Sequence, residues 1–116
     1  MSFFFRSGAL YSKIKITGVV TKEYEALVDT GAAKTGIPIN ECQKLGLRAS
    51  GIEWTEGLFG GDYLPLFESK IEFAGKVLDK SIVGLPIHIP IIGRDLIRHL
   101  KMTLDWRMLV ANVEDP

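Results

Sequence analysis

The segment of the chain with the clearest chemical potential is a carboxylate that an apolar run delivers into a turn of small residues. Asp29 follows Ala-Leu-Val and precedes Thr30, Gly31 and two alanines. Gly31 allows another backbone to approach closely, and the Thr30 hydroxyl can bond to neighbouring main chain. Because Asp and Gly are also common turn residues, the tripeptide Asp-Thr-Gly on its own is more typical of an ordinary turn than of an active site.

The elements that must position Asp29 read as short strands broken by glycine. Residues 10–17 alternate apolar and polar side chains, as in a half-buried strand. Residues 24–28 form a second apolar run that leads into Asp29, and the polar stretch between the two runs predicts a hairpin. Residues 40–46 predict a short helix, with Asn40 as its cap and Gly46 at its left-handed exit.

The rest of the chain continues the β pattern, with one further helix. The pattern predicts strands over 52–58, 63–72 and 76–84, with a hairpin tip at 59–62. It then predicts a helix over 94–102 and strands over 103–106 and 109–113. In the second helix Leu96, Ile97 and Leu100 share one face, as expected of an amphipathic helix. The sequence therefore predicts a mostly β fold with two short helices.

Size and composition place the chain among ordinary globular proteins. Its 116 residues predict a single domain, 1–116. Hydrophobic residues make up 47% and charged residues 24% of the chain, and 14 Lys and Arg balance 14 Asp and Glu. We therefore expect no nucleic-acid partner, because such proteins usually carry a basic excess. We also expect no membrane association and a cytoplasmic location, because no apolar run approaches the ~20 residues of a membrane span and no signal peptide is evident.

Cysteine chemistry and metal binding are not expected. Cys42 is the single cysteine, so neither an intrachain disulfide nor a cysteine-based metal cluster can form. A catalytic cysteine would need a histidine partner, and His88 and His99 are both distant in sequence. The sequence predicts no metal and no cofactor.

Three motifs, in order along the chain, resemble those of the retropepsin-like aspartic proteases. Asp29 lies in a segment like their active-site motif, two apolar residues followed by Asp-Thr-Gly-Ala. Residues 91–97, Ile-Ile-Gly-Arg-Asp-Leu-Ile, are similar to the second signature of the family, and residues 102–106 to the strand that follows it. Between them residues 57–61, Gly-Leu-Phe-Gly-Gly, have the position and glycine content of the flap tip. The match runs from about residue 10 to residue 113 and is specific because order and spacing agree.

The resemblance implies a closed β-barrel of the acid protease fold, assembled as a homodimer. These enzymes use two carboxylates that share a proton, whereas this chain contains one Asp-Thr-Gly and is too short for the two-lobed version. The second carboxylate would be Asp29 of another copy, across a two-fold axis. The implied activity is hydrolysis of peptide or protein substrates by a water held between the two Asp29 carboxylates.

The resemblance also implies supporting roles. Thr30, Gly31, Ala32 and Arg94 would hold the active-site loop, with Thr30 bonding to its twin and Arg94 bracing the loop from the start of a helix. Gly31 and Ala33, together with Leu58, Phe59, Gly60 and Gly61 of the flap, would contact the substrate backbone. A solvated charge on the helix surface is the alternative role for Arg94.

Two features depart from the usual family pattern. Many relatives have an acidic or hydroxyl residue two places after the motif's glycine, where this chain has Ala33, followed by Lys34. Arg94 therefore needs another partner, either Asp95 or the end of a neighbouring segment. The helix predicted at 40–46 looks more like cellular and microbial members than viral ones, in which the chain termini interleave. Either terminus of this chain could build the interface.

Two other functions are compatible with the same features. One is a retropepsin-like domain that binds peptides or proteins without cutting them, and the other is a β-barrel scaffold unit in a larger assembly. The intact Asp-Thr-Gly favours an enzyme, because a binding module has no chemical need for a carboxylate at that place.

Overall fold

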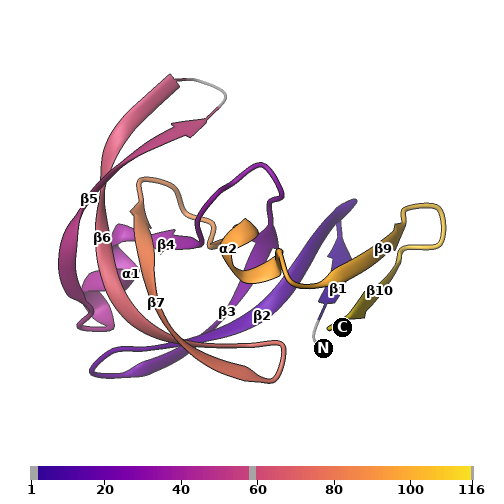
Figure 1. Cartoon of the computed structure of the whole chain (residues 1–116), viewed down its shortest axis with the longest axis horizontal. Coiled ribbons are helices and arrows are strands. Elements are labelled where there is room, and N and C mark those ends of the chain that lie inside the picture. The colour runs from indigo at the N-terminus through magenta and orange to yellow at the C-terminus, as the bar shows by residue number, and fades with distance from the viewer. Residues whose placement is uncertain (1–2, 58–59, 116) are drawn as a thin grey trace.

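A computed structural model describes residues 3–57 and 60–115 of the chain. Within these ranges the protein is mostly β, as predicted, and has two short helices (Figure 1). The strands are β1 (Phe3–Arg6), β2 (Ala9–Thr17), β3 (Thr21–Val28), β4 (Gly36–Pro38), β5 (Arg48–Gly57), β6 (Gly60–Phe73), β7 (Lys76–Leu85), β8 (Ile91–Ile92), β9 (Lys101–Asp105) and β10 (Val110–Glu114), and the helices are α1 (Ile39–Lys44) and α2 (Arg94–Ile97).

Eight of the strands form one sheet that closes on itself. Their order is β1-β2-β3-β8-β4-β7-β6-β5, and β2 also pairs with β6 through Lys15–Glu72, Ile16–Ile71 and Thr17–Lys70. This additional pairing joins β2 to β6 and completes a ring of strands, visible in Figure 1. The prediction of a closed β-barrel is thereby confirmed. Strands β9 and β10 form a separate two-stranded sheet beside the barrel.

The core of the barrel follows from the alternation along its strands. In β2 the side chains of Leu10, Ser12, Ile14 and Ile16 are buried while Lys13 and Lys15 face water, the period of two expected for a strand with one buried face. Buried residues from the other strands and both helices complete one continuous cluster, among them Ala26, Ile37, Cys42, Leu45, Phe67, Ile71, Ile82, Ile92 and Leu96.

Both helices are shorter than the sequence pattern predicts. The expected helix over 94–102 ends at Ile97, and β9 begins at Lys101. Leu96 and Ile97 are already buried after one turn, and pairing with β10 then holds residues 101–105 extended. Tertiary pairing therefore overrides the helical periodicity of this segment.

The first helix also begins differently from the prediction. It runs over Ile39–Lys44, its N-terminal boundary is Pro38, and no side chain caps it, so the capping role expected of Asn40 is wrong. The exit was predicted correctly. Gly46 has a φ of 68°, and the amides of Gly46 and Leu47 donate to the carbonyls of Gln43 and Cys42, the pattern of a Schellman C-cap.

The hairpin predicted between the two helices is present but longer. Strand β5 extends to Gly57 and β6 begins at Gly60, so Gly60, Gly61 and Asp62 lie in a strand rather than in the expected tip at 59–62. They pair with Gly57, Glu56 and Thr55. Leu58 and Phe59, expected to contact substrate, lie outside the described residues.

Candidate active site

Asp29 lies where β3 leaves the barrel. Its backbone amide donates to the carbonyl of Ile92 at 2.9 Å, which extends the parallel pairing of β3 with β8 by one residue. The carboxylate itself is half-buried. The backbone of the acid that the sequence singles out is therefore fixed against the barrel directly after Val28, the last residue of β3.

The turn after Asp29 orients its carboxylate. The amide of Gly31 donates to Asp29 Oδ1 at 2.9 Å, and the amide of Ala32 donates to the carbonyl of Asp29 at 3.1 Å. A Cβ atom on Gly31 would lie 3.2 Å from the same Oδ1, so glycine lets the turn close tightly over the acid. One carboxylate oxygen is thus committed to the protein, and the bond from Gly31 limits how far the side chain can turn, while the bond from Ala32 fixes the backbone of the turn.

Arg94 contacts the same loop from the start of α2. Its Nη1 donates to the carbonyl of Thr30 at 2.9 Å, and its backbone amide donates to the carbonyl of Ala32 at 2.8 Å. No ion pair of Arg94 occurs within the part of the chain that the structure describes. The partner left open by the sequence is therefore a main-chain carbonyl of the active-site loop, and Asp95 is occupied elsewhere.

The polar centre of this region is Thr35, which the sequence analysis did not single out. Thr35 is fully buried, and its Oγ1 donates to Asp95 Oδ1 at 2.8 Å and accepts from the amide of Gly93 at 3.1 Å. Asp95 Oδ1 also accepts from the Thr35 amide at 3.0 Å. No local pattern marks this threonine, because its partners lie about sixty residues away in sequence.

Gly93 brings the two segments into direct contact. A Cβ atom at this position would lie 2.5 Å from the carbonyl carbon and 2.7 Å from the carbonyl oxygen of Lys34. Gly93 has a φ of −92°, so the position demands space rather than an unusual backbone conformation. The glycine of Gly-Arg-Asp therefore permits the hydrogen bonds that join this segment to the Asp29 loop.

The two residues that depart from the family pattern differ in exposure and contacts. Ala33 is exposed, and its carbonyl accepts from the amide of Asp95 at 3.3 Å. Lys34 Nζ lies 3.2 Å from Glu53 Oε2 on β5. An ion pair thus links the loop that carries Asp29 to the hairpin formed by β5 and β6.

The distal part of the β5–β6 hairpin exposes an aromatic pair. Trp54 and Tyr63 meet edge to face with their ring centroids 5.0 Å apart, and both are about half exposed or more. A Cβ atom on Gly61 would lie 2.4 Å from the Trp54 indole, so the indole packs directly against Gly61. Figure 1 shows this end of the hairpin extending beyond the barrel.

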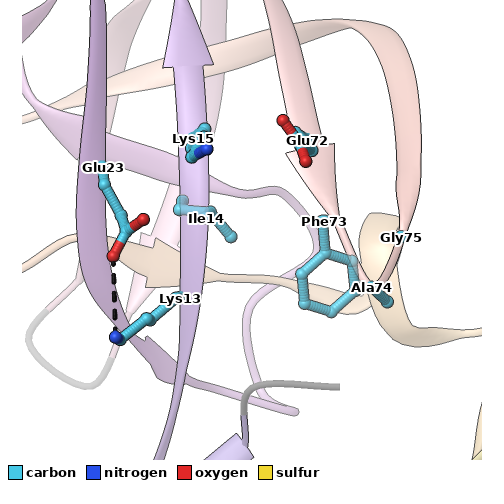
Figure 2. A pocket seen from close by; sticks show the side chains of 8 residues that line it. All are labelled: Lys13, Ile14, Lys15, Glu23, Glu72, Phe73, Ala74 and Gly75. Atoms are coloured by element: carbon cyan, nitrogen blue, oxygen red, sulfur yellow. Dashed lines mark ion pairs between the residues drawn. The ribbon is translucent and has the colours of Figure 1, made fainter.

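Two hollows in the surface lie away from Asp29. Figure 2 shows the first, lined by Lys13, Ile14, Lys15, Glu23, Glu72, Phe73, Ala74 and Gly75. Glu23 precedes Asp29 by six residues along β3, roughly 20 Å at about 3.3 Å per residue. Lys13 and Glu23 form an ion pair of 3.7 Å across this hollow. The second hollow lies between the β2–β3 turn and β6–β7, and it too contains none of the predicted site residues.

The described parts of the chain contain no set of side chains suited to cysteine-based or metal-based chemistry. Cys42 is buried, and burial raises the pKa of its thiol to about 11, so it is not a thiolate nucleophile at neutral pH. The described residues contain no cluster of three His, Cys, Asp or Glu side chains that could hold a metal ion. Neither helix of the described chain is long and apolar enough to cross a membrane.

A closed β-barrel with an Asp-Thr-Gly loop, held by a Gly-Arg-Asp segment, is the architecture of a retroviral-type aspartic protease. Residues 9–105 match the family model described as retroviral aspartyl protease. The chain therefore belongs to the retroviral aspartyl protease family. A comparison with curated protein sequences found no significant match.

Solved structures agree with this assignment of the fold. The EIAV protease, solved in complex with the inhibitor HBY-793, superposes with a TM-score of 0.67 at 18% sequence identity, covering 78% of this chain and 86% of that one. The solution structure of the simian foamy virus (mac) protease gives a TM-score of 0.56 at 14% identity, covering 76% of this chain and 91% of that one. At such low identity the likeness concerns the fold.

Proposed function

We propose that the protein is an aspartic endopeptidase that cleaves peptide bonds with a water activated by two Asp29 carboxylates, one from each subunit of a homodimer. The observation that carries this proposal is the placement of Asp29 at the end of β3, with Oδ1 bonded to the Gly31 amide at 2.9 Å. Family membership supports the same chemistry. A carboxylate oriented in this way and only half-buried can meet both a water molecule and a partner.

Two carboxylates are needed because one acid cannot serve both steps at once. An ionised Asp29 takes a proton from the water, while a protonated mate donates one to the scissile carbonyl oxygen. Like charges held close together cannot both ionise easily, so the pair shares a proton and titrates as a unit. The water adds to the carbonyl carbon to give a tetrahedral diol. A proton then passes to the leaving nitrogen as the C–N bond breaks.

The neighbours of Asp29 receive supporting roles in this proposal. Arg94 holds the loop through the carbonyl of Thr30, and the Thr30 side chain, which is exposed, bonds to its twin across the two-fold axis. The Gly31 carbonyl accepts a hydrogen bond from the substrate backbone, and the exposed Ala33 contacts that backbone. Ala32 holds the loop through its backbone, because its amide donates to the carbonyl of Asp29 and its carbonyl accepts from the amide of Arg94.

The β5–β6 hairpin acts as the flap that closes over substrate. Its strand β5 is an edge of the sheet, and Gly60 and Gly61 lie at the distal end of the hairpin, where their small size admits a peptide backbone. Closure of such a hairpin excludes water from the site and holds the peptide extended. Leu58 and Phe59 would complete the contact surface of the flap.

The test is the variant Asp29→Asn, assayed with a peptide library over pH 3–8. Asparagine keeps the shape of the side chain and can still accept the bond from Gly31 N–H, so the fold is retained. We expect the cleavage rate to fall by at least roughly 10²–10⁴-fold, the range of general acid–base catalysis. Asp79→Asn, an exposed position on β7, is the matched control and should cleave like the wild type. Cleavage that survives in Asp29→Asn would refute the catalytic assignment, and a folded wild type that binds peptides without cutting them would favour a binding domain.

A further inference from the structure

The two faces of the β5–β6 hairpin differ in exposure. Side chains alternate along a strand, and cross-strand partners share a face. The register therefore places on one face the pairs Trp54–Tyr63 and Glu56–Gly61, and on the other face the pairs Glu53–Leu64 and Thr55–Asp62. The bond of 3.0 Å from Trp54 Nε1 to Glu56 Oε1 agrees with their common face. That face is exposed, whereas Glu53, Thr55 and Leu64 on the other face are half-buried.

The face that carries Glu53 is turned toward the active-site loop. Lys34, five residues after Asp29 in that loop, has its Nζ 3.2 Å from Glu53 Oε2. This ion pair requires the Glu53 side chain to point toward the loop. Figure 1 shows the distal hairpin and the loop after β3 extending at the same end of the barrel. We call this side of the hairpin its inner face, and a peptide held between the hairpin and the loop would lie against it.

The charges on the inner face do not balance. Residues 49–69, which include the whole distal hairpin, contain four acidic and no basic side chains. Lys34 supplies one positive charge, and it pairs with Glu53. Asp62 is exposed and forms no ion pair within the described residues, and its Oδ1 accepts from the amide of Tyr63 at 2.7 Å. The inner face therefore retains an uncompensated negative charge.

The two carboxylates are spaced so that one cation can meet both. Glu53 pairs directly with Leu64, so Asp62, two residues before Leu64, is its diagonal neighbour on the same face. Diagonal neighbours in an antiparallel pair lie about 7–8 Å apart, a gap that a single ammonium or guanidinium group can bridge. Leu64 is half-buried and offers aliphatic surface beside them. Lys and Arg side chains combine a methylene stem with a charged end, and therefore fit both features.

We infer that the inner face of the hairpin selects peptide substrates with a Lys or Arg side chain close to the scissile bond. This inference rests on the proposed function, because it names the substrate class of the same site. The basic side chain bonds to Asp62 and competes with Lys34 for Glu53. An acidic side chain is repelled by Asp62, and an apolar one desolvates the carboxylates without giving them a partner, which is costly. Glu53 and Asp62 are thus specificity-determining residues.

The first test measures peptide binding without cleavage. Labelled peptides that differ only in carrying Lys, Met or Glu at one position, varied along the peptide, are titrated into Asp29→Asn and followed by fluorescence anisotropy. At one or more positions we expect Lys to bind at least about tenfold more tightly than Met, as for a hydrogen bond to a charged group, and Glu to bind most weakly. The preference should shrink as salt is added, because exposed charges are screened. Equal affinities at every position, or a preference for Glu, would overturn the inference.

The second test assigns the preference to particular side chains in the same Asp29→Asn background. Glu53→Gln and Asp62→Asn should each lose most of the preference for Lys. Lys34→Met removes the competing cation and should strengthen it. Glu56→Gln is the matched control, because it removes an acid from the opposite face of the same hairpin, and it should keep the preference. A preference unchanged in both Glu53→Gln and Asp62→Asn, or lowered as much by Glu56→Gln, would contradict the inference.

Cleavage by the wild type separates failure of this inference from failure of the proposed function. If the wild type cleaves the Lys and Met peptides with equal kcat/KM at every position, the protease stands and the inference is refuted. If Asp29→Asn binds with the expected preference but the wild type cleaves no peptide, the protease is refuted and the selective face remains that of a peptide-binding domain. Failure of Asp29→Asn to bind any of the peptides would also refute the inference.

Discussion

The loop that carries Asp29 and the hairpin of β5 and β6 differ sharply in how they are held. The loop is tied to the Gly93–Asp95 segment by hydrogen bonds from Arg94, Thr35 and several backbone amides. The distal hairpin pairs only with itself, and the Lys34–Glu53 ion pair ties it to the loop. Local stability follows the number of buried and hydrogen-bonded contacts. The loop is therefore held by more contacts than the distal part of the hairpin.

This difference suits the chemistry that we propose. An acid that must share a proton with a twin has to be positioned closely, because small displacements of catalytic groups cost rate. A flap must instead open to admit an extended peptide and then close over it. Three of the four predictions that follow alter one side of this comparison, and the remaining one concerns a third region, the helix α1.

The largest effect is expected at Gly93. In the variant Gly93→Ala the new Cβ would meet the Lys34 backbone, which cannot move aside as a flexible side chain could. We expect a loss of about 3 kcal/mol in the free energy of unfolding, measured by urea denaturation, together with loss of cleavage. Gly75→Ala is the control, because Gly75 lies in open space with a φ of 78° and should cost only backbone strain, about 1 kcal/mol. Equal losses in the two variants would mean that the close approach at Gly93 is unimportant.

The next effect concerns the buried hydroxyl of Thr35. Thr35→Val removes the bond to Asp95 and leaves the Gly93 amide without its acceptor. We expect about 2 kcal/mol of lost stability, because unsatisfied buried polar groups are costly. We also expect the substitution to lower the cleavage rate more than it changes the motion of the flap. Thr35→Ser keeps the hydroxyl and should recover most of the stability. If the serine variant is as unstable as the valine variant, packing of the methyl group matters more than the hydrogen bonds.

Acid should weaken a third region of the molecule, the start of α1. Hydrogen bonds from Lys22 and Tyr24 lower the pKa of Glu41 from 4.5 to about 2. A depressed folded-state pKa means that this stabilisation is full above about pH 4.5 and is lost as the pH falls toward 2. The difference in free energy of unfolding between wild type and Glu41→Gln should therefore be about 1 kcal/mol at pH 7 and shrink below pH 4. Glu114→Gln, which removes the same charge at an exposed ion pair of 4.0 Å, is the matched control for the loss of a surface carboxylate.

The smallest effect on stability, and the most direct test of the flap, is expected from Lys34→Met. The Lys34–Glu53 pair is about one-third exposed on each side, so its loss should change the free energy of unfolding by less than about 0.5 kcal/mol. Amide hydrogen exchange in β5 and β6 should nevertheless become faster, because the tie to the loop is gone. Lys13→Met breaks a comparable pair with Glu23 away from the hairpin and should leave that exchange unchanged. Equal exchange in the two variants would show that the pair does not restrain the flap.

Much of the barrel could be predicted from the sequence because its signals are local. Alternation along residues 10–17 identified the buried face of β2, and the apolar run before Asp29 identified the strand that carries the acid. Gly46 marked the end of α1 through its left-handed conformation. The failures were also local in origin: helical periodicity over 94–102 continued past Ile97, where pairing with β10 prevails, and Asn40 looked like a cap without serving as one.

The sequence by itself singled out Asp29 as the candidate acid, determined that only one Asp-Thr-Gly is present in the chain, and predicted which two segments should meet around it. Tertiary structure alone decided that Thr35 joins these segments, that Arg94 contacts a carbonyl of the loop, and that Lys34 reaches Glu53 on the hairpin. It also decided that β1 is paired within the chain while the C-terminal hairpin has exposed apolar residues. The physical reason is distance along the chain. Turn chemistry and alternation act between near neighbours, whereas the contacts of Thr35, Arg94 and Lys34 arise only when the barrel closes and brings together residues from 19 to 64 positions apart.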